Sequence, residues 1–216
     1  DHPESFAVYG YNKFFVDSYQ NVVLRLSRSG IDEISSTGMR SFFRNEIINT
    51  DSVNFGKGKL LGAWDSYNKE YALSIQPSNP SILFNTLSYD ERSGGWISRY
   101  SYKPSQSFSL KNQHYTTTGS SVYVHNSISA PYNNFYGVQN PSSVTFVFNP
   151  QVSNVKVFNT VNYEGSNGWQ VDSFVSSETG PGTQSNAADS VRDKTNTVFS
   201  FVQGSYDSDV PPNTGT

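Results

Sequence analysis

Three histidines, His2, His114 and His125, are the first residues of this chain that could hold a catalytic metal. A zinc site built from imidazoles needs all three side chains to converge on one ion. His114 and His125 lie in neighbouring strand-like runs and could be cross-strand neighbours, whereas His2 lies at the start of the sequence. We therefore interpret the histidines as polar surface or capping residues and predict no metal site.

Carboxylates in two places could instead support glycoside hydrolysis, which needs two acids facing each other across a cleft. Asp65 and Glu70 flank one predicted hairpin, and Asp90 and Glu91 stand together before another. An Asp at the start of a loop also accepts hydrogen bonds from backbone N–H groups of its own turn. This turn role is the favoured interpretation, so the sequence predicts no catalytic residues.

Two further patterns resemble binding motifs without having their full form. Gly56-Lys57-Gly58 with Gly62 approximates a nucleotide-binding glycine pattern. Its third glycine is misplaced, and a strand follows where a helix is required. Four aspartates that could contribute to calcium binding lack the dense spacing of a calcium loop: Asp189, Asp193, Asp207 and Asp209. We therefore predict no cofactor.

The composition explains why reactive residues are scarce. The 216 residues include no Cys, only 15% charged residues and a formal net charge of −3. Without cysteine there is no disulfide framework, thiol nucleophile or Cys-ligated metal, which fits assembly in a reducing cytoplasm. The weak negative charge gives no drive toward nucleic acid or anionic membranes. No apolar run reaches the roughly 20 residues that span a bilayer, so we predict no nucleic-acid specificity and no membrane span.

Aromatic residues make up 15% of the chain, which is too rich for a disordered polypeptide. With 16 Gly and 10 Pro, this composition indicates a β-rich, turn-rich globular protein. Surface aromatics such as Tyr132, Phe135 and Tyr136 could stack on sugars. Tyr and Phe in β proteins more often serve packing, and packing is the favoured interpretation.

Strand-like runs separated by short turn sequences fill the first 125 residues. Four hairpins are predicted from pairs of such runs: 14–17 with 22–26, 60–64 with 71–75, 82–87 with 96–100, and 114–117 with 122–125. Further strands are expected at 144–148, 155–158, 160–163 and 169–175, and a short helix or strand in 189–201. The predicted fold class is all-β, made of antiparallel hairpin units in a β-propeller-like or sandwich arrangement.

One short helix is expected over residues 38–48, with Ser36-Thr37 as its cap and Met39, Phe42, Phe43 and Ile47 on one face. We expect an N-terminal hairpin and helix portion in 1–50, a core β-domain in 51–176, and a flexible loop with a C-terminal extension in 177–216. The sequence starts without Met and trails off in polar residues, so we expect a fragment of a larger chain.

The middle of the chain resembles a motif of large virion proteins of tailed bacteriophages. Tyr89-Asp90-Glu91, then Gly95-Trp96, Ser98, Ser101-Tyr102 and Pro104 follow the approximate pattern YDE…GW-S-x-x-SY-x-P. The resemblance covers residues 8 to 175 and is closest to the muzzle proteins of crAss-like phages. The residues that carry it are Tyr89, Asp90, Glu91, Gly95, Trp96, Ser98, Tyr100, Tyr102, Pro104, Tyr123, Asn126, Tyr136, Gly137, Lys156, Phe158, Glu164, Gly165 and Trp169.

The resemblance implies a tail muzzle or tail-tip component of the virion, assembled as a ring with copies of itself and other tail proteins. Gating and host contact are further roles that it suggests. No catalytic residue comes with the motif, so the resemblance implies a protein that is not an enzyme. After Glu178 the chain departs from the family pattern: Phe199–Tyr206 only partly matches the expected charged, aromatic segment. The alternative is a carbohydrate-binding or glycan-cleaving β-domain that contacts a host-surface glycan.

Overall fold

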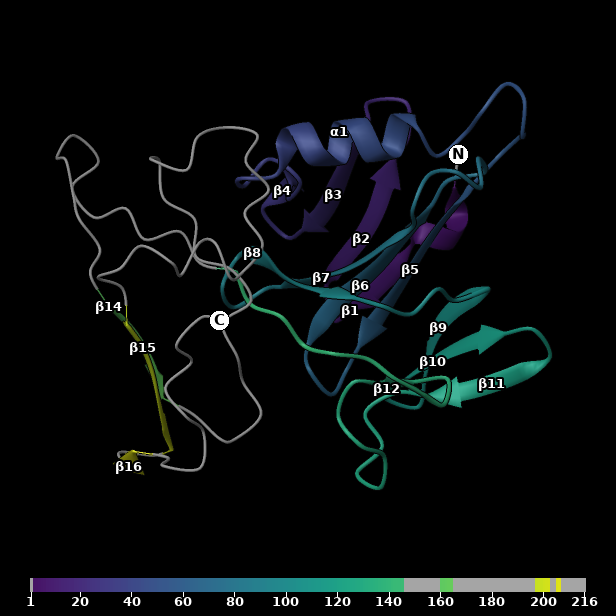
Figure 1. Ribbon diagram of the computed structural model, residues 1–216. Helices are drawn as coiled ribbons and strands as arrows, with labels where there is room; N and C mark the ends of the chain where they lie inside the picture. Colours follow the sequence, from purple (N-terminus) through teal and green to yellow (C-terminus); the bar gives the residue numbers. More distant parts are fainter. Residues whose placement is uncertain (1, 146–159, 165–196, 203–204, 207–216) are drawn as a thin grey trace, which may run out of the picture. The chain divides into compact units, whose positions relative to one another are not determined.

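The computed structural model describes residues 2–145, 160–164, 197–202 and 205–206 of the chain (Figure 1). The chain divides into two compact units, 1–144 and 145–216. In the second unit, β14 (Thr160–Glu164) pairs parallel with β15 (Thr197–Val202), and β15 pairs antiparallel with β16 (Ser205–Tyr206). The strand predicted at 160–163 is confirmed, and the strand option within 189–201 is confirmed over 197–201.

The first unit begins with a four-stranded antiparallel meander. A short 3₁₀ turn, η1 (Pro3–Ser5), leads into β1 (Ala7–Tyr9), β2 (Asn12–Asp17), β3 (Val22–Ser27) and β4 (Gly30–Glu33). The strands lie in sequence order. The hairpin predicted between 14–17 and 22–26 is confirmed, with Phe14 opposite Arg25 and Asp17 opposite Val22. Successive side chains of a strand point to opposite faces, so Phe14 and Val16 of β2 share one face, where both are buried.

A second four-stranded meander follows the helix. It contains β5 (Lys59–Asp65), β6 (Glu70–Gln76), β7 (Asn85–Asp90) and β8 (Gly95–Tyr100), again in sequence order. Every residue of β6 and β7 is buried. The prediction placed a strand at 82–87, but β7 begins three residues later, because a turn precedes it in which Asn79 accepts from the N–H groups of Ser81 and Ile82. The strand continues to Asp90, whose carboxylate starts the next turn. Ile82 and Leu83 are exposed instead.

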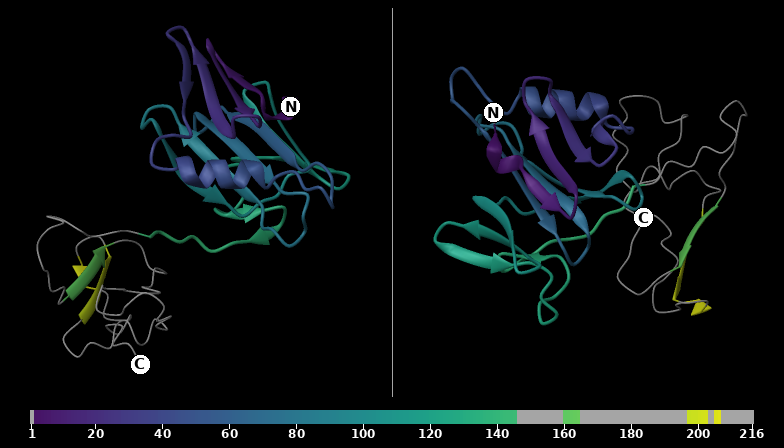
Figure 2. Two further views of the ribbon diagram at one scale, coloured as in Figure 1. Left: turned by 90° about the horizontal axis from the view of Figure 1, so that it is seen from above. Right: turned by 180° about the vertical axis from the view of Figure 1, so that it is seen from behind.

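The helix α1 (Arg40–Ile48) confirms the predicted helix, and Phe43 and Ile47 on its inner face are buried. Its predicted cap is wrong. Met39 occupies the cap position without a side-chain hydrogen bond, because the Ser36 hydroxyl donates to the carbonyl of Glu33 and closes the turn after β4. Figure 2 shows the helix lying along the first meander.

The core lies where the two meanders meet. The ring of Phe14 in β2 stacks on Tyr71 of β6 at 5.0 Å and on Trp64 of β5 at 5.5 Å between centroids. All three side chains are almost fully buried. Two antiparallel sheets joined by such rings form a sandwich-like all-β fold, so the predicted fold class is confirmed. The propeller-like alternative stays a prediction.

A third sheet of β9 (Gln106–Leu110), β10 (Gln113–Thr118) and β11 (Ser121–Val124) docks beside β5. The Ser109 hydroxyl accepts a hydrogen bond from the N–H of Trp64 at 3.0 Å and donates to its carbonyl. One side chain thus occupies the place of a strand partner along β5. The hairpin predicted between 114–117 and 122–125 is confirmed over β10 and β11. A small ladder of β12 (Asn134–Phe135) and β13 (Val138–Gln139) follows.

The predicted division at residues 50 and 176 stays a prediction. Of the strand expected at 144–148, residues 144 and 145 are described and do not belong to a strand, and the rest lies outside the described residues. The strands expected at 155–158 and 169–175, and most of the loop expected after 177, also lie outside the described residues.

Candidate functional site

The motif turn between β7 and β8 is held by its own carboxylate. Asp90 accepts hydrogen bonds from the N–H groups of Arg92 at 3.2 Å and Ser93 at 3.3 Å. Partial burial alone would raise the pKa of Asp90, but the hydrogen bonds from Arg92 and Ser93 hold it below its ordinary value. Gly94 takes a φ of +66°, which a glycine adopts without steric cost. Asp90 therefore serves turn chemistry here, as the sequence favoured.

Glu91 ties this turn to the first meander. Its Oε1 accepts a hydrogen bond from the Asn12 amide at 2.6 Å and lies 3.6 Å from Nη1 of Arg25. Arg25 also donates from Nη2 to Asp32 at 2.9 Å. The result is a network of two carboxylates, one guanidinium and one amide that spans β2, β3, β4 and the β7–β8 turn. The sequence placed Glu91 in the motif but did not show its partners.

Trp96 connects the same two sheets through its ring. Its indole N–H donates to the carbonyl of Ile34 at 3.0 Å. The ring packs against Phe43 of α1 at 4.5 Å and against Tyr89 of β7 at 5.5 Å. Trp96 thus joins the helix, the end of β4 and the second meander, which agrees with the packing role predicted for it.

The motif continues from β8 into an aromatic cluster, defined here as Tyr100, Tyr102, His125, Phe135 and Tyr136. Tyr102 is buried at its centre, with ring centroids 5.5 Å from Tyr100, 4.7 Å from His125 and 5.0 Å from Phe135. Burial raises the pKa of the Tyr102 phenol well above its ordinary value. A phenol held neutral in this way serves packing, not acid–base exchange near neutral pH.

Buried hydrogen bonds hold the segment that follows β8 in place. The Thr86 hydroxyl donates to the carbonyl of Tyr102 at 2.8 Å, and the Gln76 amide donates to the carbonyl of Pro104 at 2.6 Å. Both acceptors follow the last residue of β8. Ser98 pairs with Ser88 across β7 and β8, while Gly95 has a negative φ and open space around it.

The later motif residues gather near the third sheet. Tyr123 packs on Tyr136 with ring centroids 4.7 Å apart, and the Tyr136 hydroxyl donates to Thr116 at 2.9 Å. Tyr136 and Gly137 both have positive φ, at 56° and 82°. Asn126 donates from its amide to Asp65 at 2.8 Å, which ties the end of β11 to the β5–β6 turn.

His114 and His125 form a stacked pair, as their predicted cross-strand placement indicated. Their rings are 4.5 Å apart and nearly parallel. His125 Nε2 lies 2.7 Å from the Thr116 hydroxyl, and His114 Nε2 lies 3.0 Å from that of Ser107. Burial lowers the pKa of His114, and burial together with the charge of His114 lowers the pKa of His125 to about 4. Both rings are therefore neutral near pH 7.

His2 lies in a different place, at the entrance of η1, with its Nε2 3.8 Å from Asp51. The three histidines do not converge. Among the described residues, no group of three or more His, Cys, Asp or Glu side chains could hold a metal ion.

Asp65, Glu70 and Asp90 lie side by side at one end of the second meander, with Glu70 opposite each of the others in the strand register. Asp65 accepts from the N–H of Tyr67 at 2.9 Å and from the Asn126 amide. Burial raises the pKa of Glu70, opposed by hydrogen bonds with Ser88 and Tyr100. Two of the three carboxylates are thus engaged in turns, and none lines either of the hollows described next.

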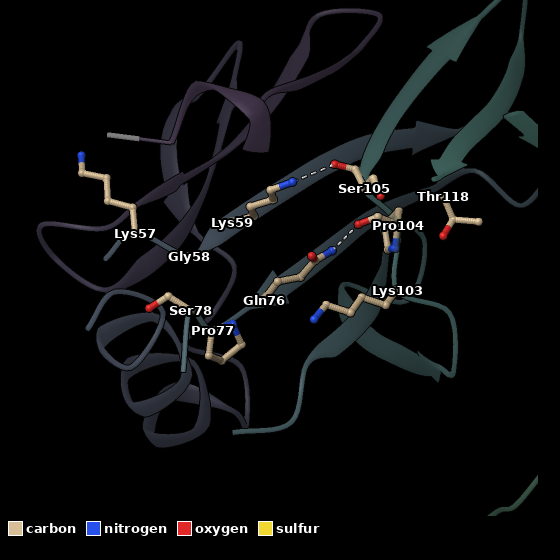
Figure 3. A pocket seen from close by; sticks show the side chains of 10 residues that line it. All are labelled: Lys57, Gly58, Lys59, Gln76, Pro77, Ser78, Lys103, Pro104, Ser105 and Thr118. Carbon is tan, nitrogen blue, oxygen red and sulfur yellow. Dashed lines mark hydrogen bonds between the residues drawn. The ribbon is translucent and has the colours of Figure 1, made fainter. Parts of the chain in front are cut away.

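A lysine groove lies at the other end of this meander. It encloses about 400 Å³ between the start of β5, the end of β6 and the segment after β8 (Figure 3). Lys57, Lys59 and Lys103 line it. Figure 3 shows Lys59 reaching toward Ser105, Lys103 reaching back toward Pro77, and Lys57 at the far end. A second hollow, of about 610 Å³, lies beside η1 and is lined by His2, Phe6 and Asp17 among others.

The glycines that approximated a nucleotide motif serve close packing. A Cβ on Gly62 would lie 2.0 Å from the carbonyl oxygen of Ser5, and one on Gly58 would lie 2.3 Å from that of Thr50. The strand β5 follows these glycines directly, as predicted, so no helix N-terminus is present to receive a phosphate.

Among the surface aromatics, Tyr132 is 95% exposed, whereas Phe135 and Tyr136 belong to the aromatic cluster. Packing is thus the role of the last two. Several candidate residues lie outside the described residues: Lys156, Phe158, Gly165, Trp169, Asp189, Asp193, Asp207 and Asp209. Glu164 is described only as a position in β14.

These contacts define a structural β-domain whose distinctive residues join sheets and fix turns. Residues 130–202 match the family model described as the Crassvirus muzzle protein C-terminal domain. The chain is also 22% identical over 168 residues to the muzzle protein of Bacteroides phage crAss001, an alignment that covers 77% of this chain. The chain is therefore related to the muzzle proteins of crAss-like phages, as its central motif indicated. It covers 12% of that relative's length.

Sequence reasoning missed the lysine groove. Lys57 was considered only within a glycine pattern, and Lys59 and Lys103 stood 44 positions apart with no shared motif. The predicted hairpins could have indicated the groove. In a four-stranded antiparallel meander the start of the first strand and the end of the fourth lie at the same end of the sheet, and Lys59 and Lys103 lie at the start of β5 and just after β8. Among the described residues, no helix is long and apolar enough to cross a membrane.

Proposed function

We propose that this chain is a non-enzymatic part of a phage tail protein of the muzzle type, which acts by packing against neighbouring virion subunits. The observation that carries the proposal is the match to the crAss001 muzzle protein over 77% of the chain. Ring assembly with copies of itself and with other tail proteins, gating and host contact are finer parts of the same proposal. Assembly would take place in the host cytoplasm, and the finished protein would reside in the virion tail.

An uncharged face of the third sheet supports a packing role. Five apolar side chains point to one side of the sheet β9–β11. Residues directly opposite each other in the ladder, or two apart along one strand, share a face. These five are Phe108, Leu110, Tyr115, Val122 and Val124. Phe108 and Tyr115 stack there at 5.6 Å, and Leu110 and Val122 are 56% and 62% exposed. Contiguous exposed apolar surface of this kind typically marks an interface.

The alternative of a glycan-binding or glycan-cleaving domain has less support. It requires two carboxylates across a cleft, but Asp65 and Asp90 bind their own turns. Contact of a tail protein with a host-surface glycan is compatible with the first proposal and stays a prediction.

Mass spectrometry of purified particles tests the proposal. Peptides of this chain should be recovered from density-banded virions in constant ratio to the major capsid protein. After cross-linking of intact particles, they should be joined to other tail proteins. Recovery of the peptides from cell lysate but not from banded particles would overturn the proposal.

A further inference from the structure

The lysine groove carries positive charge that no ion pair of the described residues neutralises. Lys57, Lys59 and Lys103 line it, and none of the six lysines in the described residues forms an ion pair. The described ion pairs all use arginine or histidine. Lys59 makes one long hydrogen bond, at 3.4 Å, to the carbonyl of Ser105. The Nζ atom of Lys103 lies over the face of the Phe84 ring, 5.8 Å from its centroid.

Among the described residues, no carboxylate lines the groove. Asp51 lies beside it, because it accepts from the N–H of the lining residue Gly58 at 2.9 Å. Its described ion-pair partner is His2, whose Nε2 is 3.8 Å away, and not a lysine of the groove. The floor is fixed by the buried Gln76 amide, which donates to Ser74 and to the carbonyl of Pro104. A floor held by buried hydrogen bonds, below ammonium groups without an ion-pair partner among the described residues, is suited to bind an anion from solution.

The charge pattern specifies the ligand. Lysine is a compact point charge with three donors, whereas planar bidentate recognition of a carboxylate is the property of arginine, and no arginine is among the residues that line the groove. Charged groups on Lys57, Lys59 and Lys103 can therefore each meet a different anionic group of a ligand. A volume of about 400 Å³ is larger than one inorganic anion needs and falls in the ordinary range for an organic ligand. Hydroxyl groups of Ser78 and Thr118 on its walls add neutral hydrogen-bond partners. No aromatic ring lines the groove to stack on a sugar.

We propose that this groove binds an acidic peptide segment of a partner protein, with Lys59 and Lys103 as the principal charge contacts. The segment carries at least two carboxylates spaced along an extended backbone. The segment belongs to a different protein, because the adjacent carboxylates of this chain's central motif, Asp90 and Glu91, are engaged within its own fold. The inference stands on the groove alone and does not depend on the assignment to a phage tail.

Fluorescence anisotropy of the full chain tests this with a short labelled peptide of alternating Asp and Ser and its neutral Asn–Ser counterpart. The acidic peptide should bind and the neutral one should not. Binding should weaken as salt rises from about 0.05 to about 0.5 M, since screening shortens the reach of exposed charges. The double variant Lys59→Gln/Lys103→Gln should bind roughly three- to tenfold more weakly, because exposed charge pairs are individually modest.

The matched control is Lys69→Gln/Lys111→Gln, which changes the net charge equally but lies in the β5–β6 and β9–β10 turns, away from the groove. It should bind like the unchanged chain. Lys103→Gln alone, which removes no hydrogen bond of the described structure, guards against a folding defect in the double variant. Equal affinity of the groove and control variants would overturn the proposal.

Two competitors separate the remaining ligands. Displacement of the peptide by inorganic phosphate at similar concentration would show a small-anion site, and binding of polygalacturonate without binding of the peptide would show an anionic-glycan site. Either result would overturn the proposal. Sedimentation velocity tests the choice of partner: a monomer that binds the peptide supports a different protein as the partner, whereas self-association that is lost in the groove variant would place a second copy in the groove and overturn that choice.

Discussion

Arg25 and Glu91, which are 66 positions apart in the sequence, meet at 3.6 Å between Nη1 and Oε1. Arg25 comes from the middle of β3, and Glu91 follows the last residue of β7. Both are partly shielded from water, with 26% and 18% of their side chains exposed. This pair, with Asn12, joins two separately formed meanders through the turn that carries the central motif.

Replacement of Glu91 by Ala should destabilise the first unit by about 1–3 kcal/mol, because it leaves the Asn12 amide and the Arg25 guanidinium without their shared acceptor. Urea unfolding at neutral pH measures the change. Glu4→Ala, an exposed acid in η1, is the control and should shift the free energy of unfolding by less than about 0.5 kcal/mol. Equal effects of the two changes would contradict a joining role for Glu91.

Phe14→Ala should cost about 3–5 kcal/mol, since it removes a fully buried ring that stacks on Trp64 and Tyr71 across the two sheets. Tyr19→Ala removes a ring that is 95% exposed and should be nearly neutral. Thermal unfolding followed by near-ultraviolet circular dichroism reports both. A small effect of Phe14→Ala would mean that the sheets do not share this core.

Gly62→Ala should be strongly destabilising, because its Cβ would collide with the backbone carbonyl of Ser5, which also accepts the buried Tyr71 hydroxyl at 2.6 Å. Gly95→Ala is the matched control, since it has open space and a negative φ. It should be neutral or stabilising by up to about 1 kcal/mol. Soluble yield and the urea midpoint of each variant provide the measurement, and comparable stabilities would rule out the close approach of η1 to β5.

Acidification should destabilise the fold through the histidine pair. Burial lowers the pKa values of His114 and His125 in the folded chain, the latter to about 4, below the ordinary value of 6.5. Between the folded and the ordinary pKa values the unfolded chain therefore binds more protons than the folded chain. The stability that the neutral histidine pair contributes is fully present above about pH 6.5 and is lost as pH falls toward 4. His2 and Asp90, whose pKa values are also lowered, act in the same direction, whereas Glu70, whose pKa is raised, acts against it.

The variant His114→Gln/His125→Gln isolates the pair from these other groups. Gln can keep a polar atom near Thr116 and Ser107, the partners of the two Nε2 atoms. Between pH 7 and pH 5 its urea midpoint should fall less than that of the unchanged chain. Parallel pH profiles for both proteins would assign the acid sensitivity to other groups.

Hairpins and the helix were predictable from the sequence because their signals are local. Turn residues and alternation placed β2–β3, β5–β6 and β10–β11, and the spacing of Phe43 and Ile47 placed α1. The boundaries of β7 were wrong because the turns at Asn79 and Asp90, which precede and follow it, depend on hydrogen bonds that residue type alone does not specify. The cap of α1 was wrong for the same reason, since Ser36 binds Glu33 instead.

The amino-acid sequence by itself determined the all-β class, the scarcity of reactive groups and the motif that relates the chain to muzzle proteins. Each of these depends on composition or on short-range order. Only the tertiary structure decided which residues meet: Glu91 with Arg25, His114 with His125, and Lys59 with Lys103 around one groove. The physical reason is that contacts between sheets depend on register and on the docking of one meander against another. Strand register and the docking of the two sheets depend on how the side chains of the whole core pack together, which no local stretch of sequence specifies.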